Sequence, residues 1–430
     1  MMKAFVMQKL FLGFVIFTTP FAANAAGFGL AEQSGSGLGN AFAGASSIAE
    51  DASTIFANPA GMTYIEGTQA AGVLHLIKPS AEFNNQGSQS GTARPLGNEG
   101  GDAGDLAFVP NFYFMTTLAN NVKLGLGVNA PFGLQTEYNS DWLGRFQAVK
   151  SELKTININP AIAFKANEQL SLGFGLSAMW AQAELTNAVN FGPFGEGFGK
   201  VKGDDWGFGF NLGAIYQATN DTRIGVAYRS KIEQHLEGDV KFKRPTGLPA
   251  PFVAASQNSD VKADLTLPET FSISAFSRLN DTWDLMGDIT WTRWSQFEEL
   301  AIYRDSGTLL TKTTENWDNT MRYSIGVNYH YSDAIKLRAG LAYDEEAISN
   351  QYRTARIPGN DRKWLAFGAA WQATASTILD VGYAHLFISD TDIDDNQAAP
   401  VAPSPFGKGR VRGDYDSSVD VLSLQVTHNF

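Results

Sequence analysis

From residue 66 onward, apolar side chains repeatedly alternate with small or polar ones. Along residues 122–129, Val, Leu, Leu and Val occupy one set of positions, and Lys, Gly, Gly and Asn occupy the other. Residues 170–177 and 335–343 alternate in the same way. A period of two places successive side chains on opposite faces of a β-strand. The pattern therefore predicts many strands that each carry one apolar face suited to lipid.

Short and long connections between these strands alternate along the chain. Six are tight polar turns, at residues 119–121, 166–168, 219–221, 280–281, 332–333 and 373–375. Seven are longer and rich in Gly, Pro, Asn and charge, near residues 84–105, 138–151, 187–205, 236–262, 299–314, 344–361 and 389–414. Together they join about fourteen strands, with both chain ends on the side of the short turns. This arrangement predicts an all-β fold, a transmembrane antiparallel β-barrel.

Aromatic residues recur near the predicted strand ends, where a ring with a polar edge settles at the lipid–water boundary. They are Tyr216, Tyr228, Trp283, Trp291, Trp294, Tyr329, Tyr331, Trp364, Trp371 and Tyr383. We expect them to form the two girdles of a barrel. The last strand alternates up to Phe430, and a terminal aromatic residue is typical of the clients of barrel-assembly machinery. A soluble β-sandwich would instead need two sheets with facing apolar sets.

The first 25 residues have the pattern of a secretory signal peptide. Lys3 and Lys9 precede an apolar run over residues 10–17, and small residues around 21–25 offer a cleavage site after Ala25. The run is too short for a spanning helix, which needs roughly 20 residues. Removal of this segment, which holds two lysines, changes the net charge from −12 to −14. The sequence predicts an exported, acidic protein.

Residues 26–65 break the alternating pattern. They are crowded with Gly, Ala and Ser, and they include Asn58, Pro59 and Ala60. A stretch of this kind before the first strand either hangs in the periplasm or folds into the bore. Its small residues and its scattered apolar ones favour packing inside. We therefore expect a hatch over residues 26–65 and a barrel over residues 66–430.

Composition excludes several classes of function. The chain has no cysteine and hence no thiol or disulfide chemistry. It has no Lys/Arg-rich run, so nucleic acid is not an expected partner. The five histidines lack metal-ligand spacing, and no nucleophile-elbow motif occurs. We expect no cofactor, no metal and no enzyme, although a lipase or esterase site assembled across strands, or a purely structural barrel, stays an alternative.

The predicted third strand carries an interruption. It runs regularly to Val128 and then meets Asn129, Ala130, Pro131, Phe132 and Gly133. Pro131 cannot donate a ladder hydrogen bond, and Gly133 favours a bulge. An unpaired backbone group in hydrocarbon is costly, so such a break is expected where the chain is covered by protein or lines a cavity. The alternative is that Pro131 only marks the end of the strand.

The sequence resembles the FadL-type transporters of long-chain fatty acids and hydrocarbons in Gram-negative outer membranes, over nearly the whole mature chain. The resemblance rests on motifs that occur in order, namely AGF at 26–28, SGLG at 36–39, NPA at 58–60, WGFGFN at 206–211, LTLPE at 265–269, WSQF at 294–297 and IPGNDR at 357–362. It implies a monomeric fourteen-stranded barrel with a hatch. It also implies passive uptake of apolar cargo, which leaves sideways into the membrane at the interrupted third strand.

The resemblance also implies a binding pocket that the first hatch residues, Gly27 and Phe28, contact. Basic side chains hold the carboxylate there in the fatty acid transporters of the family. The first matching position here is Asn187, and the second is Thr313, beside Lys312 on the opposite face. Either Arg322, Arg229 or Lys312 substitutes for these basic residues, or the cargo is an uncharged hydrocarbon.

The sequence thus predicts a passive channel for hydrophobic compounds, with a general porin as the nearest alternative. Expected partners are hydrophobic small molecules such as fatty acids, hydrocarbons and detergents. Outer-membrane lipid, lipopolysaccharide and the barrel-assembly machinery are expected as well. An open porin would show discrete conductance steps in a planar bilayer, whereas the predicted hatch would block them.

Overall fold

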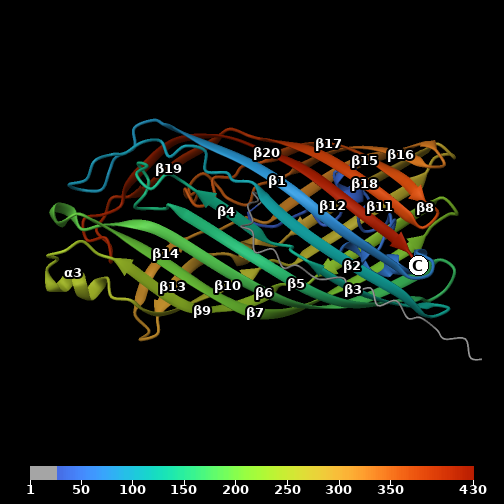
Figure 1. Cartoon of the computed structure of the whole chain (residues 1–430), viewed down its shortest axis with the longest axis horizontal. Helices are drawn as coiled ribbons and strands as arrows, with labels where there is room; N and C mark the ends of the chain where they lie inside the picture. The colour runs from blue at the N-terminus through green and yellow to red at the C-terminus, as the bar shows by residue number, and fades with distance from the viewer. Residues whose placement is uncertain (1–26) are drawn as a thin grey trace, which may run out of the picture.

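The computed structural model describes residues 27–430, so the expected signal peptide and its cleavage site lie outside the described residues. Twenty strand segments of this part of the chain form one antiparallel sheet. The first segment, β1 (Gln69–Asn85), pairs along its whole length with the last, β20 (Gly409–Asn429). The sheet therefore closes into a barrel without open edges (Figure 1).

The segments make fourteen barrel strands, as predicted. Eight are continuous, namely β1, β2 (Ala107–Ala119), β5 (Lys150–Lys165), β6 (Leu170–Asn190), β7 (Glu196–Gln217), β16 (Ile335–Asp344), β17 (Arg362–Thr374) and β20. Six are split in two, namely β3 (Val122–Asn129) with β4 (Gly133–Glu137), β8 (Thr222–Arg229) with β9 (Ile232–Lys243), β10 (Ser259–Leu267) with β11 (Thr270–Arg278), β12 (Trp283–Thr292) with β13 (Glu299–Arg304), β14 (Leu309–Thr314) with β15 (Thr320–Ser332), and β18 (Thr377–Ile388) with β19 (Thr391–Gln397).

The six tight turns occur where the sequence predicts them, but several of the long connections are shorter than predicted. Residues 187–205 are mostly strand, because β6 and β7 stay paired up to Asn190 and Glu196. Residues 236–262 and 299–314 likewise continue as β9–β10 and β13–β14 hairpins. These hairpins project beyond the part of the barrel with an apolar outer face. Their inward side chains, such as Val240 and Val261, are apolar, and their outward ones, such as Lys241 and Lys262, are charged. The charged outward positions give these segments the composition of loops.

The two faces of the wall differ as the alternation predicts. Large apolar side chains such as Leu124, Leu172 and Leu341 are exposed on the outside. Neighbouring positions such as Lys123 and Ser171 are buried. An apolar outer face and a covered inner face are typical of a barrel in lipid.

Two tryptophans assigned to the aromatic girdles lie inside the barrel instead. Trp364 is on an inward position of β17 and packs against Phe42 of the N-terminal segment. Trp294 lies in a short 3-10 helix, η3 (Trp294–Gln296), where the strand alternation stops and the side chain turns inward. Trp283, Trp371 and Tyr331 are exposed, as girdle residues should be.

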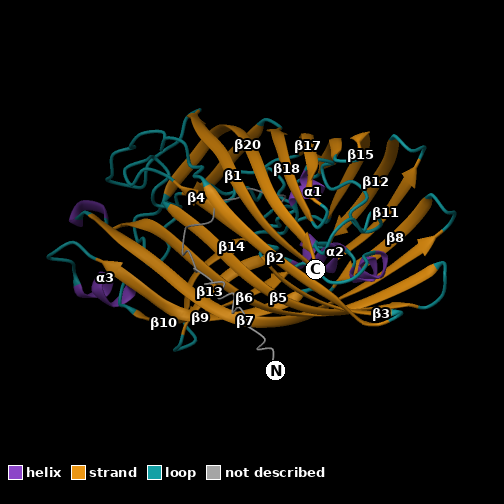
Figure 2. Ribbon diagram, turned by 45° about the vertical axis from the view of Figure 1, so that its right-hand side comes forward, coloured by secondary structure: helices purple, strands orange, loops and turns teal. Residues whose placement is uncertain are grey.

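Residues 27–65 fill part of the bore, and we call them the hatch. They form α1 (Gly35–Leu38), α2 (Thr54–Ala57) and the 3-10 helix η1 (Pro59–Tyr64), which lie inside the ring of strands (Figure 2). Glycines of the wall allow this close approach. A Cβ atom at Gly225 would lie 1.9 Å from the carbonyl oxygen of Ser46, and one at Gly340 would lie 2.2 Å from the carbonyl carbon of Asn40.

The remaining helices are short and lie at the end of the barrel that carries the long connections or near it. They are η2 (Gly192–Phe194), α3 (Ala250–Ala255) and η3. None of the described helices is long and apolar enough to cross a membrane.

Candidate functional site

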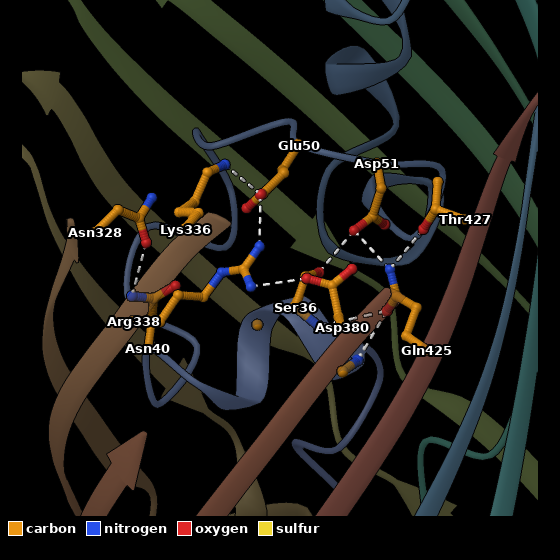
Figure 3. Close-up of polar contacts among 12 residues, drawn as sticks. Ser36, Asn40, Glu50, Asp51, Asn328, Lys336, Arg338, Asp380, Gln425 and Thr427 are labelled. Carbon is orange, nitrogen blue, oxygen red and sulfur yellow. Dashed lines mark hydrogen bonds and ion pairs between the residues drawn. The ribbon is translucent and has the colours of Figure 1, made fainter. Parts of the chain in front are cut away.

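A buried ionic network fastens the hatch to one side of the barrel (Figure 3). The Glu50 carboxylate accepts hydrogen bonds of 2.6 Å each from Lys336 Nζ and Arg338 Nη2. Arg338 Nη1 also donates to Asp380 Oδ1 at 2.7 Å. Buried charges are tolerated only when they are paired and hydrogen-bonded, as these are. The network therefore ties the hatch to β16 and β18.

A second polar cluster continues this attachment to the last strand. Asp51 Oδ2 accepts from Ser36 Oγ at 2.6 Å and from Gln425 Nε2 at 2.8 Å (Figure 3). Gln425 Oε1 in turn accepts from the backbone N–H of Gly35 at 2.8 Å. The start of α1 is thus fixed to β20.

The predicted hatch motif Asn58-Pro59-Ala60 attaches the hatch to the opposite wall. Asn58 Nδ2 donates to the carbonyl oxygens of Ser46 at 2.7 Å and of Ala214 in β7 at 3.1 Å. Asn58 Oδ1 accepts from the N–H of Ala60 at 3.1 Å and so caps η1, with Pro59 as its first residue. One residue therefore ends α2 through its backbone N–H, and its side chain begins η1 and holds the hatch against the barrel.

The first described hatch residues lie in an aromatic cluster at mid-bore. The ring centroid of Phe28 is 4.7 Å from that of Trp294, 5.4 Å from Trp317, 5.7 Å from Phe297 and 6.2 Å from Phe132. Such edge-on contacts favour a fixed geometry. Phe28 is thereby held at the centre of the bore.

Gly27, next to this cluster, has a φ of +60°, and a Cβ there would lie 2.5 Å from the Trp317 ring. Only glycine meets both conditions. The backbone N–H of Gly27 donates to Glu346 Oε1 at 3.2 Å. The chain is thus fixed immediately before Phe28.

The third barrel strand is interrupted where the sequence predicts it. On the β5 side, pairing stops at Asn129 opposite Asn157 and resumes at Gly133 opposite Lys154. Three residues on one strand therefore face two on the other, which is a bulge. On the β2 side, pairing ends at Val128, and in the described chain β4 pairs only with β5.

The hatch supplies hydrogen-bond partners for the interrupted segment. The N–H of Leu30 donates to the Pro131 carbonyl at 2.8 Å, and the N–H of Gly133 donates to the Phe28 carbonyl at 2.9 Å. Phe132 N–H donates to Thr155 Oγ1 at 3.2 Å. The bulge is therefore satisfied from inside the bore.

Two adjoining cavities occupy the bore between Phe28 and the long connections. The first, the apolar cavity, has a volume of about 90 Å³ and is lined by Phe28, Leu134, Leu153, Leu236, Leu265 and Phe297, among others. The second, the cationic cavity, has a volume of about 60 Å³. Leu185, Val201, Leu300, Ile302 and Arg356 line both. The two cavities therefore adjoin across these side chains, and the apolar cavity reaches Phe28.

The cationic cavity holds the two positions that the resemblance assigns to the ligand. Asn187 and Thr313 both line it. Arg356 and Lys408 line it too, and both come from loops. Burial lowers the pKa of the Arg356 guanidinium to about 10 and that of the Lys408 ammonium to about 8. Sequence reasoning missed this pair, because neither loop has a periodic pattern that places a side chain.

The other basic candidates lie elsewhere. Arg322 and Arg229 line a separate cavity of about 250 Å³ between the hatch and the wall, together with Pro131 and Phe132. Both arginines donate to hatch carbonyls, Arg322 to Ala41 at 2.8 Å and Arg229 to Phe56 at 2.8 Å. We call this space the hatch-side cavity, and its arginines contribute to holding the hatch.

Lys312 points away from the bore. Its side chain is 44% exposed and forms an ion pair with Glu299 across the β13–β14 hairpin. It lines none of the three cavities described above. The strand alternation places it on the face opposite Thr313, as the sequence indicates.

The histidines of the described chain do not assemble a hydrolytic site. His75 contacts Ser423 in the wall, but its other ring nitrogen has no partner there. His235 and His385 each contact an aspartate, Asp264 and Asp420, without a neighbouring serine or threonine hydroxyl among their hydrogen bonds. In residues 27–430, no cluster of His, Asp and Glu could hold a metal ion.

A closed fourteen-strand barrel with an apolar outer face and a segment packed in its bore defines the class of outer-membrane β-barrel proteins. Residues 16–430 match the family model described as outer membrane protein transport protein (OMPP1/FadL/TodX). The chain belongs to this family, which confirms the resemblance inferred from the sequence. The family consists of transport proteins rather than enzymes, and the protein resides in the outer membrane of a Gram-negative bacterium.

Curated relatives cover most of the chain. A long-chain fatty acid transport protein of Escherichia coli O6:H1 is 31% identical over 395 residues, which are 84% of this chain and 86% of the relative. Outer membrane protein P1 of Haemophilus influenzae is 32% identical over 406 residues, 85% of this chain and 86% of the relative.

Solved structures agree with the fold. The crystal structure of a Pseudomonas aeruginosa FadL homologue superposes with a TM-score of 0.88 at 26% identity, over 94% of this chain and 100% of that one. The Pseudomonas putida toluene transporter TodX gives 0.68 at 16% identity, over 88% of this chain and 94% of that one, and shows the fold alone.

Proposed function

We propose that the protein takes up hydrophobic compounds, long-chain fatty acids or related hydrocarbons, by passive diffusion through its bore and a lateral opening at the interrupted third strand. One observation carries this proposal. The cationic cavity adjoins the apolar cavity, the apolar cavity reaches Phe28, and Phe28 contacts Phe132 of the interruption. A molecule that enters from the long connections would thus arrive beside β4.

The hydrogen-bond pattern at the interruption supports a sideways exit. β4 lacks a ladder to β2 in the described chain, and two prolines flank this seam, Pro110 in β2 and Pro131 in the bulge. Neither residue can donate a ladder hydrogen bond. Separation of β2 from β4 therefore breaks no backbone ladder. Apolar cargo would then enter the hydrocarbon interior of the membrane directly.

The hatch argues against the porin alternative. Ionic and polar contacts tie it to β16, β18, β20 and β7, so opening a polar pore would require breaking them together. We therefore expect no discrete porin-like conductance in planar bilayers. Large, long-lived conductance steps of the wild-type protein would instead favour a porin.

The surroundings of the protein follow from the same proposal. The apolar outer face would contact outer-membrane lipid, with lipopolysaccharide in the outer leaflet, and a single barrel suffices for transport. The alternating last strand that ends in Phe430 suits recognition by barrel-assembly machinery. Detergents are expected to occupy the bore of the purified protein.

The proposal is tested by a variant that can complete the backbone hydrogen-bond ladder at the interrupted third strand. In Gram-negative cells that lack their own transporter, uptake of radiolabelled oleate is measured for the wild type and for a P131V/G133A variant. Uptake is expected to fall by about tenfold or more, which corresponds to 1.4 kcal/mol in the rate barrier. P160T is the control, because Pro160 lies on the lipid-facing side of β5, away from the interruption.

Heat-dependent migration in gels reports whether each variant folds. Unchanged uptake by a folded P131V/G133A barrel would remove the lateral route from the proposal. A loss of uptake in P160T as large as in the double variant would show that the effect is not specific to the interruption.

A further inference from the structure

Two half-buried cations of the cationic cavity, Arg356 and Lys408, have no anionic partner. Some buried arginines are neutralised, for example Arg338 by Asp380 at 2.7 Å. Others, Arg229 and Arg353, are instead satisfied by neutral acceptors such as the carbonyl oxygens of Phe56 and Gly359. Within residues 27–430, neither Arg356 nor Lys408 has a carboxylate oxygen within 4.0 Å. A charge that is partly withdrawn from water without a counter-charge is destabilising, which favours binding of a ligand that offsets it.

The hydrogen bonds of Arg356 orient its charge without neutralising it. Nη1 donates to the carbonyl oxygen of Lys150 at 3.2 Å and to Ser151 Oγ at 3.0 Å, and Nη2 donates to the carbonyl oxygen of Gln147 at 2.9 Å. All three acceptors are neutral. The guanidinium is thus fixed in direction and keeps its full charge for a ligand.

The nearest carboxyl groups are held by other donors. Asp395 Oδ2 accepts from Gln397 Nε2 at 2.8 Å, and Glu315 Oε2 accepts from Trp317 Nε1 at 3.0 Å. The Lys408 side chain forms no hydrogen bond with the described residues, whereas its backbone N–H is bound by Gln397. The positive end of the cavity therefore has unused capacity for an anion.

The walls beyond these cations are apolar. Leu185, Val201, Leu300 and Ile302 line both this cavity and the next, which ends on Phe28. Asn187 and Thr313, also in the wall, are neutral and cannot supply the charge. The site combines a cationic end with a long apolar continuation, which is the complement of an amphipathic anion.

We propose that Arg356 and Lys408 together bind the anionic head group of a long-chain carboxylate, whose hydrocarbon tail extends through the apolar cavity toward Phe28. The inference rests on the proposed function, because it concerns the cargo that enters the same bore. It assigns the charged contact to the loops 345–361 and 398–408 rather than to the barrel positions 187 and 313. An uncharged hydrocarbon would leave both cations without a partner.

Binding to the purified full-length protein in maltoside detergent tests the proposal. Affinities for oleate and for its uncharged methyl ester are measured by isothermal titration calorimetry for the wild type, R356Q, K408Q and the double variant. The oleate affinity is expected to fall about tenfold in each single variant and further in the double variant, while the ester affinity changes less than about twofold. K241Q, an exposed lysine paired with Asp239 outside the cavities, is the control and should match the wild type.

R356K is the control for a loss of folding, because it keeps the positive charge but loses part of the hydrogen bonding of the guanidinium. It should keep more oleate affinity than R356Q. Equal losses for oleate and ester, or no loss for oleate, would overturn the head-group assignment. Failure of the uptake route is distinguishable, because oleate binding would then still depend on the two cations while cells expressing the wild type accumulate no oleate.

Discussion

Phe28 and Trp294 lie edge to face, with ring centroids 4.7 Å apart and an angle of 79° between the ring planes. One residue belongs to the hatch and the other to a 3-10 helix between β12 and β13. Their contact separates the apolar cavity, which Phe28 lines, from the hatch-side cavity, which Trp294 lines. The position of the hatch therefore sets the depth of the apolar cavity.

Replacement of Phe28 by alanine should weaken binding of apolar ligands. The substitution removes the floor of the apolar cavity and leaves space among Trp294, Trp317 and Phe297. A buried Phe-to-Ala change costs about 3–5 kcal/mol of packing, which local collapse of the cluster recovers only partly. We expect the affinity for a long-chain ester to fall about tenfold, measured by calorimetry, while F208A on the lipid face leaves it unchanged.

Addition of a side chain at Gly225 should displace the hatch. A Cβ atom there would lie 1.9 Å from the carbonyl oxygen of Ser46. Because this oxygen belongs to the backbone, it cannot move aside as a flexible side chain could. We expect G225A to expose the hatch to periplasmic proteases and to make cells sensitive to large antibiotics. Gly287 is the matched control, because its nearest atom is at 3.6 Å. Equal protease resistance of G225A and G287A would contradict the tight packing described here.

Removal of the Arg338 charge alone should loosen the hatch more than removal of the Arg338 and Asp380 charges together. R338M leaves Asp380 buried without a counter-charge, which costs about 3–5 kcal/mol, whereas Glu50 keeps its ion pair with Lys336. In the double variant R338M/D380N no uncompensated buried charge remains in the network, and much of the stability should return. Thermal unfolding in detergent, followed by near-ultraviolet circular dichroism, measures the difference. An R338M midpoint at or above that of the R338M/D380N variant would be the contrary outcome.

Binding of an anionic ligand should weaken as the pH rises through about 8. Burial lowers the pKa of Lys408 to about 8, so its ammonium is charged at pH 7 and mostly neutral at pH 9. Arg356 and Asp395 are the charged groups that face it, and Arg356, whose pKa is about 10, keeps its charge through this range. The affinity for decanesulfonate, whose head group stays ionised, is expected to fall several-fold between pH 7 and pH 9.

The variant K408R is the control for this pH dependence. An arginine stays protonated throughout that range, so its profile should be flat. A wild-type profile that is equally flat would show that Lys408 does not contribute its charge to binding.

Much of the fold follows from alternation alone, because a wall with lipid on one side imposes a period of two. The six tight turns, the fourteen strands and the position of the interrupted strand were all predicted from that pattern. The hairpin ends around residues 187–205 were not, because their content of Gly, Pro, Asn and charge resembles that of a loop. Trp294 and Trp364 were misplaced for a related reason, since composition near a strand end does not say which face a ring occupies.

The site was only partly predictable. The family resemblance placed Phe28 at the pocket, and a local signal, a proline in a strand, located the interruption at Pro131. Arg356 and Lys408 carry no such signal, because each lies in an irregular loop, and the way in which two loops fold toward one cavity leaves no periodic pattern in the sequence. Lys312, one place from the expected position, points outward because neighbouring residues of a strand face opposite sides.

The seam between β1 and β20 has a consequence for biogenesis. The hatch leaves the ribosome before any strand, yet it ends up enclosed, with Gly35 bound to Gln425 of the strand that is made last. Arg338 of β16, which binds Glu50, is also made late. These contacts can form only once the C-terminal strands are in place, so fixing of the hatch and closure of the barrel are coupled steps of membrane insertion.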